Sequence, residues 1–225
     1  MEQCRICRFP CRSVRRSPGG ARFEVDCVRC GQYAIITEAT TNSLIEERRF
    51  TAIQVANLSG YIRQNPGFVI LERDLERLRN LQTPSVDEKA ANLLIGLGKE
   101  FPQPGRSISI DCKRLDVDLD LTASVRASDG MYPDDSFPDL ACQASKWMSI
   151  ASATSPEELR YLLKDFLEGQ RFVAEKLAGA FVITPKGWQH IADLRRTQSK
   201  STKAFVAMSF APISTGFLLT RWNLV

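Results

Sequence analysis

The feature that most constrains this chain of 225 residues is a repeated cysteine pair near its start. Cys4-x-x-Cys7 is followed, after nineteen intervening residues, by Cys27-x-x-Cys30. Two such pairs at this separation are the ligand pattern of a structural zinc site, in which four thiolates surround Zn²⁺ tetrahedrally and leave no open position. Few bulky apolar side chains lie between the pairs, so the metal must supply much of the local folding free energy, about 10–16 kcal/mol in comparable peptides.

Disulfides and unligated thiols are the alternative interpretations of these cysteines. The chain has seven cysteines, an odd number, and its N-terminus carries arginines where a signal peptide would need an apolar core. It also lacks a run of about 20 apolar residues that would span a membrane. We therefore expect a cytoplasmic, reducing location, which favours metal binding. Cys11 lies near Cys7 and is either a spare thiol or a substitute ligand.

The net charge of +4 is concentrated around the cysteines. Residues 1–31 contain seven arginines, no lysine and three carboxylates, whereas the remainder holds 23 basic and 23 acidic residues. These arginines can bind the phosphates of DNA or RNA. They can equally neutralise the metal centre, because four thiolates and one Zn²⁺ leave a charge of about −2. The candidate nucleic-acid contacts are Arg5, Arg8, Arg12, Arg15, Arg16, Arg22 and Arg29.

The pattern of strands and helices predicts an α+β fold that begins with two small segments. Residues 1–40 are predicted to form a zinc ribbon, because apolar residues alternate with others on either side of the second cysteine pair. Residues 41–84 are predicted to be a helical connector. Its main helix is expected over residues 43–64, with Ser43 and Glu46 as a capping box.

A mainly helical domain is predicted over residues 85–198. Capping boxes at Ser85 and Ser155 each precede an apolar stripe with helical spacing, and Gly98 is expected to end the first of these helices. Residues 108–125 alternate as a half-buried strand would. Two further short strands and a helix that starts at Pro185 complete the domain.

The order helix, strand, turn, strand, helix resembles a winged-helix fold. The resemblance rests on Phe166-Leu167-Glu168-Gly169, on the hairpin ending in Val182-Ile183-Thr184, and on Pro185-Lys186-Gly187-Trp188. Winged helices usually bind DNA, but many pack only against protein. The candidate recognition helix, residues 157–168, is mildly acidic, whereas a helix that reads DNA should be basic. The sequence therefore favours protein packing.

Residues 199–225 are predicted to be a linker followed by an orphan strand at 203–210, buried on both faces, of the kind that opens an α/β domain. Too few residues follow for a sheet of parallel strands, so we expect the domain to be truncated. The alternative is that Phe205, Phe210 and Trp222 pack back onto the preceding domain.

The whole pattern resembles a group of bacterial multidomain proteins. The shared features are the paired cysteines, Ser59-Gly-Tyr-Ile-Arg63, Thr-Pro-Lys-Gly-Trp188 and the Ala-Phe-Val-Ala-Met-Ser-Phe strand. In that group a zinc ribbon and a helical sensor region precede a domain similar to TIR or nucleoside 2-deoxyribosyltransferase folds. The resemblance implies a role in antiviral signalling and a downstream domain that binds or cleaves a nucleotide. It transfers no catalytic residue to this chain.

The sequence shows no nucleophile–base set, no phosphate-binding glycine loop and no open metal site. The first hypothesis is therefore a non-enzymatic, zinc-binding sensor or interaction module whose partner is a protein or its own missing C-terminal domain. The second is a DNA- or RNA-binding regulator that uses the arginines and the wing. A nucleotide-processing enzyme is the third, and the missing sheet argues against it.

Overall fold

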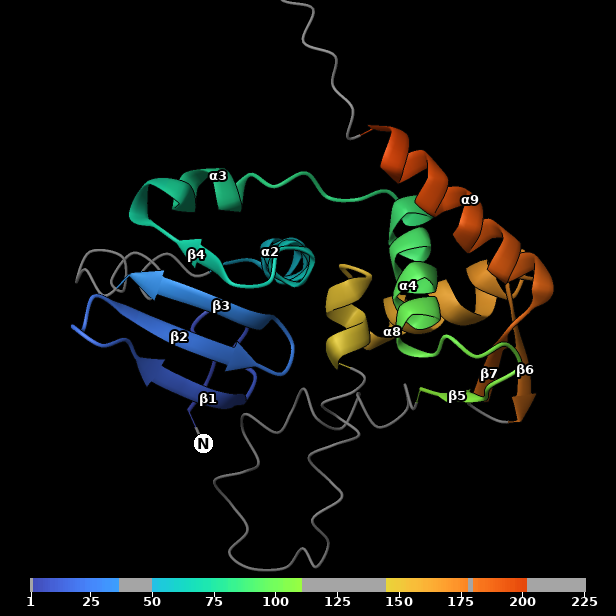
Figure 1. Ribbon diagram of the computed structural model, residues 1–225, viewed down its shortest axis with the longest axis horizontal. Coiled ribbons are helices and arrows are strands. Elements are labelled where there is room, and N and C mark those ends of the chain that lie inside the picture. The colour runs from blue at the N-terminus through green and yellow to red at the C-terminus, as the bar shows by residue number, and fades with distance from the viewer. Residues whose placement is uncertain (1, 37–49, 111–144, 178–179, 202–225) are drawn as a thin grey trace, which may run out of the picture.

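The computed structural model describes residues 2–36, 50–110, 145–177 and 180–201, and these residues combine helices and strands around two hydrophobic cores. The α+β expectation is confirmed at this level. Figure 1 shows a sheet at one side of the molecule and a mainly helical lobe at the other, with α2 (Ala52–Gln64) between them.

The N-terminal sheet has four strands in the order β1-β2-β3-β4. The first three are β1 (Cys11–Arg16), β2 (Arg22–Cys27) and β3 (Gly31–Ile36), and they pair antiparallel. Gly19 and Gly20 carry the β1–β2 turn with φ of 88° and 73°, a region that favours glycine. The fourth strand, β4 (Phe68–Ile70), returns after α2 and pairs parallel to β3.

Helix α2 covers one face of this sheet and shares its core. The helix begins after Thr51, whose hydroxyl accepts a hydrogen bond from the Gln54 amide while the Gln54 side chain accepts one from the Thr51 amide. The prediction of one helix over 43–64 is therefore wrong, because residues 50 and 51 are not helical. The 3₁₀ turn η1 (Glu72–Asp74) and the short helix α3 (Leu75–Arg79) follow.

A single core unites the cysteine loops with α2, β4 and α3. Its buried members are Cys4, Ile6, Cys11, Val25, Cys27, Cys30, Tyr33, Ile35, Leu58, Ile62, Ile70, Leu75 and Leu78. The described part of the expected connector, residues 41–84, thus belongs to the same packing unit as the cysteine segment. We call this unit, residues 2–81, the first lobe.

The second lobe begins with α4 (Val86–Glu100) and contains helical residues 145–150, α8 (Pro156–Tyr161), the π-helical segment η2 (Leu162–Leu167) and α9 (Pro185–Ser201). Three short strands form its sheet: β5 (Ile108–Ser109), β6 (Val173–Leu177) and β7 (Ala180–Ile183). Their order is β5-β7-β6, with both pairs antiparallel. The helices pack on a core drawn from residues 90–191.

Two helices in this lobe are longer than the sequence suggested. Helix α4 continues through Gly98, where a Cβ would come 2.8 Å from Ile191 Cδ1, so the glycine permits close packing of α4 on α9. Helix α9 extends to Ser201 through most of the expected linker. Most of the strand expected at 108–125 and the whole strand at 203–210 lie outside the described residues.

The start of α9 gives a physical reason for its Thr-Pro-Lys-Gly sequence. Thr184 Oγ1 accepts a hydrogen bond from the Gly187 amide and donates to the Arg171 carbonyl at 2.6 Å. Pro185 occupies the first helical position, where no amide donor is needed. Gly187 lies against the Phe172 carbonyl, so no larger residue fits there.

The start of α8 contains a buried ion pair that the sequence did not indicate. Ser155 caps the helix as expected, but the Glu158 carboxylate does not complete the capping box. It accepts instead from the amide and hydroxyl of Thr154, both at 2.7 Å, and from Lys89 Nζ at 2.5 Å. Burial raises the pKa of Glu158, but these hydrogen bonds outweigh burial and hold it below its ordinary value. Only 7% of the Lys89 side chain is exposed, so solvent screens its attraction to Glu158 only weakly. The pair therefore links α4 to α8.

Replacing Glu158 by Gln is expected to lower the free energy of unfolding by about 2–4 kcal/mol, because it leaves the Lys89 ammonium buried without a partner. A carboxylate with a lowered folded pKa stabilises fully above its unfolded pKa of about 4.3 and loses that contribution as pH falls through the folded value. Urea unfolding at pH 7 and pH 3.5 measures both effects. The difference between the wild type and E158Q should shrink at the lower pH.

The matched control is Asp193→Asn, which removes the exposed Asp193–Arg196 pair of α9 and should change stability by less than about 0.5 kcal/mol. Equal effects of the two substitutions would show that the Lys89–Glu158 pair has no special role.

Candidate metal centre

Two short loops at the same end of the sheet place the four predicted cysteine ligands. In the first loop the Arg8 amide donates to the Cys4 carbonyl at 2.9 Å, and Arg8 itself takes a φ of 64°. In the second loop the Cys30 amide donates to Cys27 Sγ at 3.4 Å, and Gly31 follows with a φ of 85°. Amides directed at sulfur and a left-handed residue after the second cysteine are the means by which a CxxC turn points both sulfurs inward.

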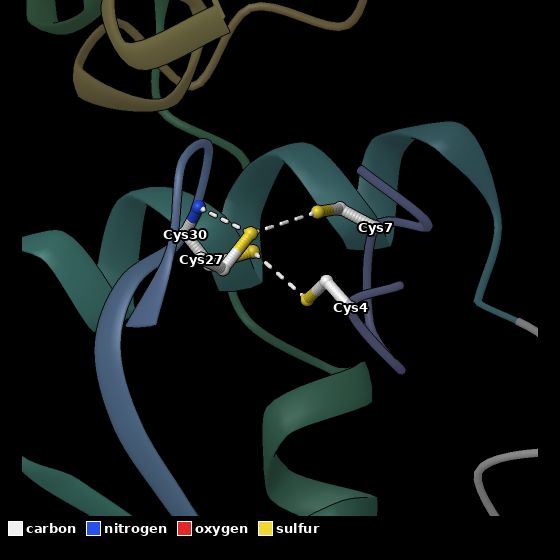
Figure 2. A group of neighbouring side chains, drawn as sticks. All are labelled: Cys4, Cys7, Cys27 and Cys30. Carbon is white, nitrogen blue, oxygen red and sulfur yellow. Dashed lines mark hydrogen bonds between the residues drawn. The ribbon is translucent and has the colours of Figure 1, made fainter. Parts of the chain in front are cut away.

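The four sulfurs converge on one point. Their Sγ atoms all lie within 4.8 Å of one another, and Figure 2 shows them pointing toward a common centre. Cys4 Sγ lies 3.9 Å from Cys30 Sγ, and Cys7 Sγ lies 3.5 Å from Cys27 Sγ. A regular tetrahedron with metal–sulfur bonds of about 2.3 Å has edges of about 3.8 Å, so these separations suit one tetrahedral ion. The geometry fits a metal ion held by four thiolates.

Hydroxyl groups from two other elements contact the sulfurs. Tyr33 Oη on β3 lies 3.0 Å from Cys4 Sγ, and Ser59 Oγ on α2 lies 3.2 Å from Cys30 Sγ. A hydroxyl beside a thiolate acts as the donor, and burial, followed by the charge of Cys4, raises the pKa of Tyr33, which keeps its proton in place. Such partners orient ligands and moderate their charge.

The thiols perturb one another's proton affinity. Hydrogen bonds from Cys11 and then from Cys27, Cys30 and Cys7 lower the pKa of Cys4 well below its ordinary value, against the effect of burial. The pKa of Cys7 is raised, first by its hydrogen bond with Cys27, and burial raises the pKa of Cys30. Four thiolates therefore require a cation among them. The donor set is soft, buried on three of its four cysteines, and closed to a further ligand.

Cys11 lies beside this group without joining it. It is 7% exposed and faces Cys27 across the β1–β2 pair. The set of sulfurs within 4.8 Å of one another contains the four predicted ligands and excludes Cys11. Its hydrogen bond with Cys4 and its burial raise the pKa of its thiol. This placement supports the interpretation of Cys11 as a spare thiol.

The seven arginines differ in their exposure to solvent. Arg8, Arg12, Arg15, Arg16 and Arg22 are exposed and Arg5 is half-buried. Carboxylates pair with two of the exposed ones, through Arg12–Asp26 at 3.9 Å and Arg22–Glu24 at 3.0 Å. Arg29 is only 5% exposed, so a phosphate could not reach it without rearrangement.

Three residues around the centre were not identified from the sequence as contributors to it: Tyr33, Ser59 and Arg63. Arg63 Nε donates to the Arg29 carbonyl at 2.7 Å, and its Nη2 donates to the Val28 carbonyl, so α2 holds the second cysteine loop by its backbone. Ser59 and Arg63 lie one helical turn apart on α2 in the Ser-Gly-Tyr-Ile-Arg stretch, and only the fold shows that both face the cysteines.

Comparison of the chain with protein-family models, curated proteins and solved structures finds no match. Among the described residues, no helix is both long and apolar enough to cross a membrane. The functional conclusion therefore rests on the site.

Serine substitutions distinguish the four predicted metal ligands from Cys11. Cys4→Ser, Cys7→Ser, Cys27→Ser and Cys30→Ser are each expected to reduce the affinity for metal at least 100-fold, because each removes a thiolate from a closed tetrahedral set. Cys11→Ser should retain one ion per chain. Elemental analysis and a competition titration with a chromophoric chelator measure both quantities. Loss of the ion in Cys11→Ser would instead make Cys11 a ligand.

Proposed function

We propose that this chain is a non-enzymatic, zinc-binding sensor and interaction module. The observation that carries the proposal is the closed group of four cysteine sulfurs. A site with four protein ligands leaves no coordination position for water or substrate, and such sites fold a segment instead of performing catalysis. In this interpretation β1, β2, β3 and the two cysteine loops form a zinc ribbon.

Zinc is the metal that this donor set favours. Four thiolates in tetrahedral array select Zn²⁺ or iron. Zn²⁺ has no redox chemistry and suits a site buried beneath α2 as a structural centre.

Elemental analysis of purified protein is expected to find one zinc ion per chain and less than a tenth of that amount of iron. Strong chelation should remove β-sheet signal from the far-UV circular dichroism spectrum, because the first lobe loses a restraint worth about 10 kcal/mol or more. An unchanged spectrum in a metal-free sample would refute the structural role, and iron at full occupancy would refute the identity of the ion.

We propose that the second lobe is a winged-helix domain that packs against protein. The support is its element order and the strand order β5-β7-β6, with α8 and η2 in the position of the recognition helix. The outer side of that helix carries Tyr161, 48% exposed, between charges of both signs. Lys164 is paired with Glu175 of β6 at 3.0 Å, which removes one of the two positive charges from the helix. A mixed surface with an exposed tyrosine suits a protein partner better than a phosphate backbone.

Nucleic-acid binding through the first lobe is the second candidate function, favoured by the exposed Arg12, Arg15 and Arg16 on β1. The resemblance to bacterial proteins with TIR-like or deoxyribosyltransferase-like domains remains a proposal as well. The strand that carries part of that resemblance lies outside the described residues.

Salt dependence distinguishes the two candidates. Titration of labelled random duplex DNA and single-stranded RNA with the zinc-loaded protein at 50 and 200 mM salt is expected to show weak binding and no difference between the wild type and an Arg12→Ala/Arg15→Ala/Arg16→Ala variant. A 10-fold or larger loss of affinity with salt, abolished in the triple variant, would establish nucleic-acid binding instead. The matched control is Arg73→Ala/Arg77→Ala/Arg79→Ala in η1 and α3.

A further inference from the structure

The two lobes contact each other beside the candidate metal centre, and we call this contact region the seam. On the first lobe the seam contains the second cysteine loop and α2. On the second lobe it contains residues 149–153, which are the last turn of the helix at 145–150 and the turn that follows it before α8. Figure 1 shows α2 next to this helix.

Arg29 is the contact that comes directly from the cysteine loop. It lies between Cys27 and Cys30, and its Nη2 donates to the Ala153 carbonyl at 3.3 Å. The guanidinium stacks over Phe9 at 5.5 Å. Its Nε is buried without a hydrogen-bond partner, and no carboxylate pairs with it in the described part of the chain. A buried guanidinium held by one carbonyl stays in place only while its own loop is held firmly.

Helix α2 supplies the second contact, because consecutive residues face the two lobes. Ser59 reaches Cys30 Sγ, and Gly60 packs on the second lobe. A Cβ at Gly60 would come 3.0 Å from the Ser149 carbonyl oxygen and would overlap Ser152 Oγ. The seam therefore has no room for a methyl group, and its fit depends on the position of α2.

The second-lobe side of the seam is held in an unfavourable backbone conformation. Ser152 has a φ of 50°, a left-handed conformation that is unfavourable for a residue with a Cβ. Its amide donates to the Ser149 carbonyl, and the amides of Ala151 and Ala153 donate to the Trp147 and Met148 carbonyls of the preceding helix. These hydrogen bonds make the segment observable by amide exchange.

We infer that the cysteine centre controls the seam: loading with Zn²⁺ fixes the loop of Cys27 to Cys30, and this fixed loop holds residues 149–153 through Arg29. When the loop is released, Arg29 loses its position, the strained segment relaxes, and the surface leading into α8 changes. This inference rests on the proposed zinc site and names its regulation. In this inference, the presence or absence of the metal ion determines the conformation of residues 149–153 in the second lobe.

The charge of the loaded centre supports this coupling. Four thiolates around one Zn²⁺ leave about −2, and the two buried or half-buried arginines nearest in the fold to the second cysteine loop are Arg29 and Arg63. Burial lowers the pKa of Arg63, while the charges of Cys30 and Cys27 raise it. Arg63 of α2 therefore lies in the field of the cysteine charges, while Arg29 of the same loop contacts the Ala153 carbonyl.

Hydrogen–deuterium exchange on the full chain tests the inference. With zinc bound, amides in 149–153 are expected to be protected. Chelation should increase their exchange rate at least 10-fold, while β6, β7 and α9 keep their protection. Arg29→Ala should retain one zinc per chain and yet show the fast exchange at 149–153 with and without metal. Arg15→Ala, an exposed arginine of the same lobe, is the control and should behave as the wild type.

Gly60→Ala is a second variant that leaves every charge and ligand in place. It should also keep its zinc and lose protection at 149–153, because the added methyl separates the seam. Stoichiometric zinc together with unchanged exchange at 149–153 after chelation would overturn the inference and leave the proposed zinc site intact. Loss of protection throughout the second lobe would overturn it too, because the effect would then be unfolding. Absence of zinc would refute the proposed function itself.

Discussion

The first lobe depends on one constraint: four cysteine sulfurs must occupy the same few ångströms of space. Uncharged thiols have no reason to converge there, and four thiolates repel one another unless a cation lies among them. The divalent ion that we propose for this site would offset the repulsion and join chain segments 20 to 26 residues apart. The three short antiparallel strands, the position of α2 and the site of β4 all follow from it.

The second lobe is stabilised in a different way. Its core is apolar and large, its helices begin at strong side-chain caps, and glycines at close contacts bring α4 and α9 together. The described residues of this lobe contain no group of metal-ligating side chains. With the zinc site that we propose, folding of the first lobe depends on metal, so the first lobe can act as an input to the second.

Local chemistry explains which features the sequence could predict. The four ligands follow from cysteine spacing, because a CxxC turn has one effective way to present two sulfurs. The caps at Ser85 and Ser155 follow from hydrogen bonds within four residues. The helix start expected at Ser43 lies outside the described residues, and α2 begins instead at the capping box of Thr51 and Gln54.

Features that depend on contacts between distant segments were not predictable. The sequence did not distinguish Arg29 from the other six arginines, five of which are exposed, and contacts with Phe9 and Ala153 bury it. His190 is half-buried, and its ring stacks on that of Phe172 with the ring centroids 4.3 Å apart, a contact between residues 18 positions apart. The three-residue strand β4 is too short to have a sequence pattern of its own, and it exists because β3 offers it an edge.

The pairing of β4 with β3 determines the shortest fragment that keeps the packing of the first lobe. Since β4 pairs with β3, and α2 and α3 cover the sheet, a fragment cut at residue 40 would leave Tyr33 and Ile35 bare to water and the edge of β3 unpaired. Gene rearrangements that preserve the cysteine lobe must therefore carry the chain through Leu81. The unit that evolution or a protein engineer can move therefore extends well beyond the cysteine motif of Cys4 to Cys30, to Leu81.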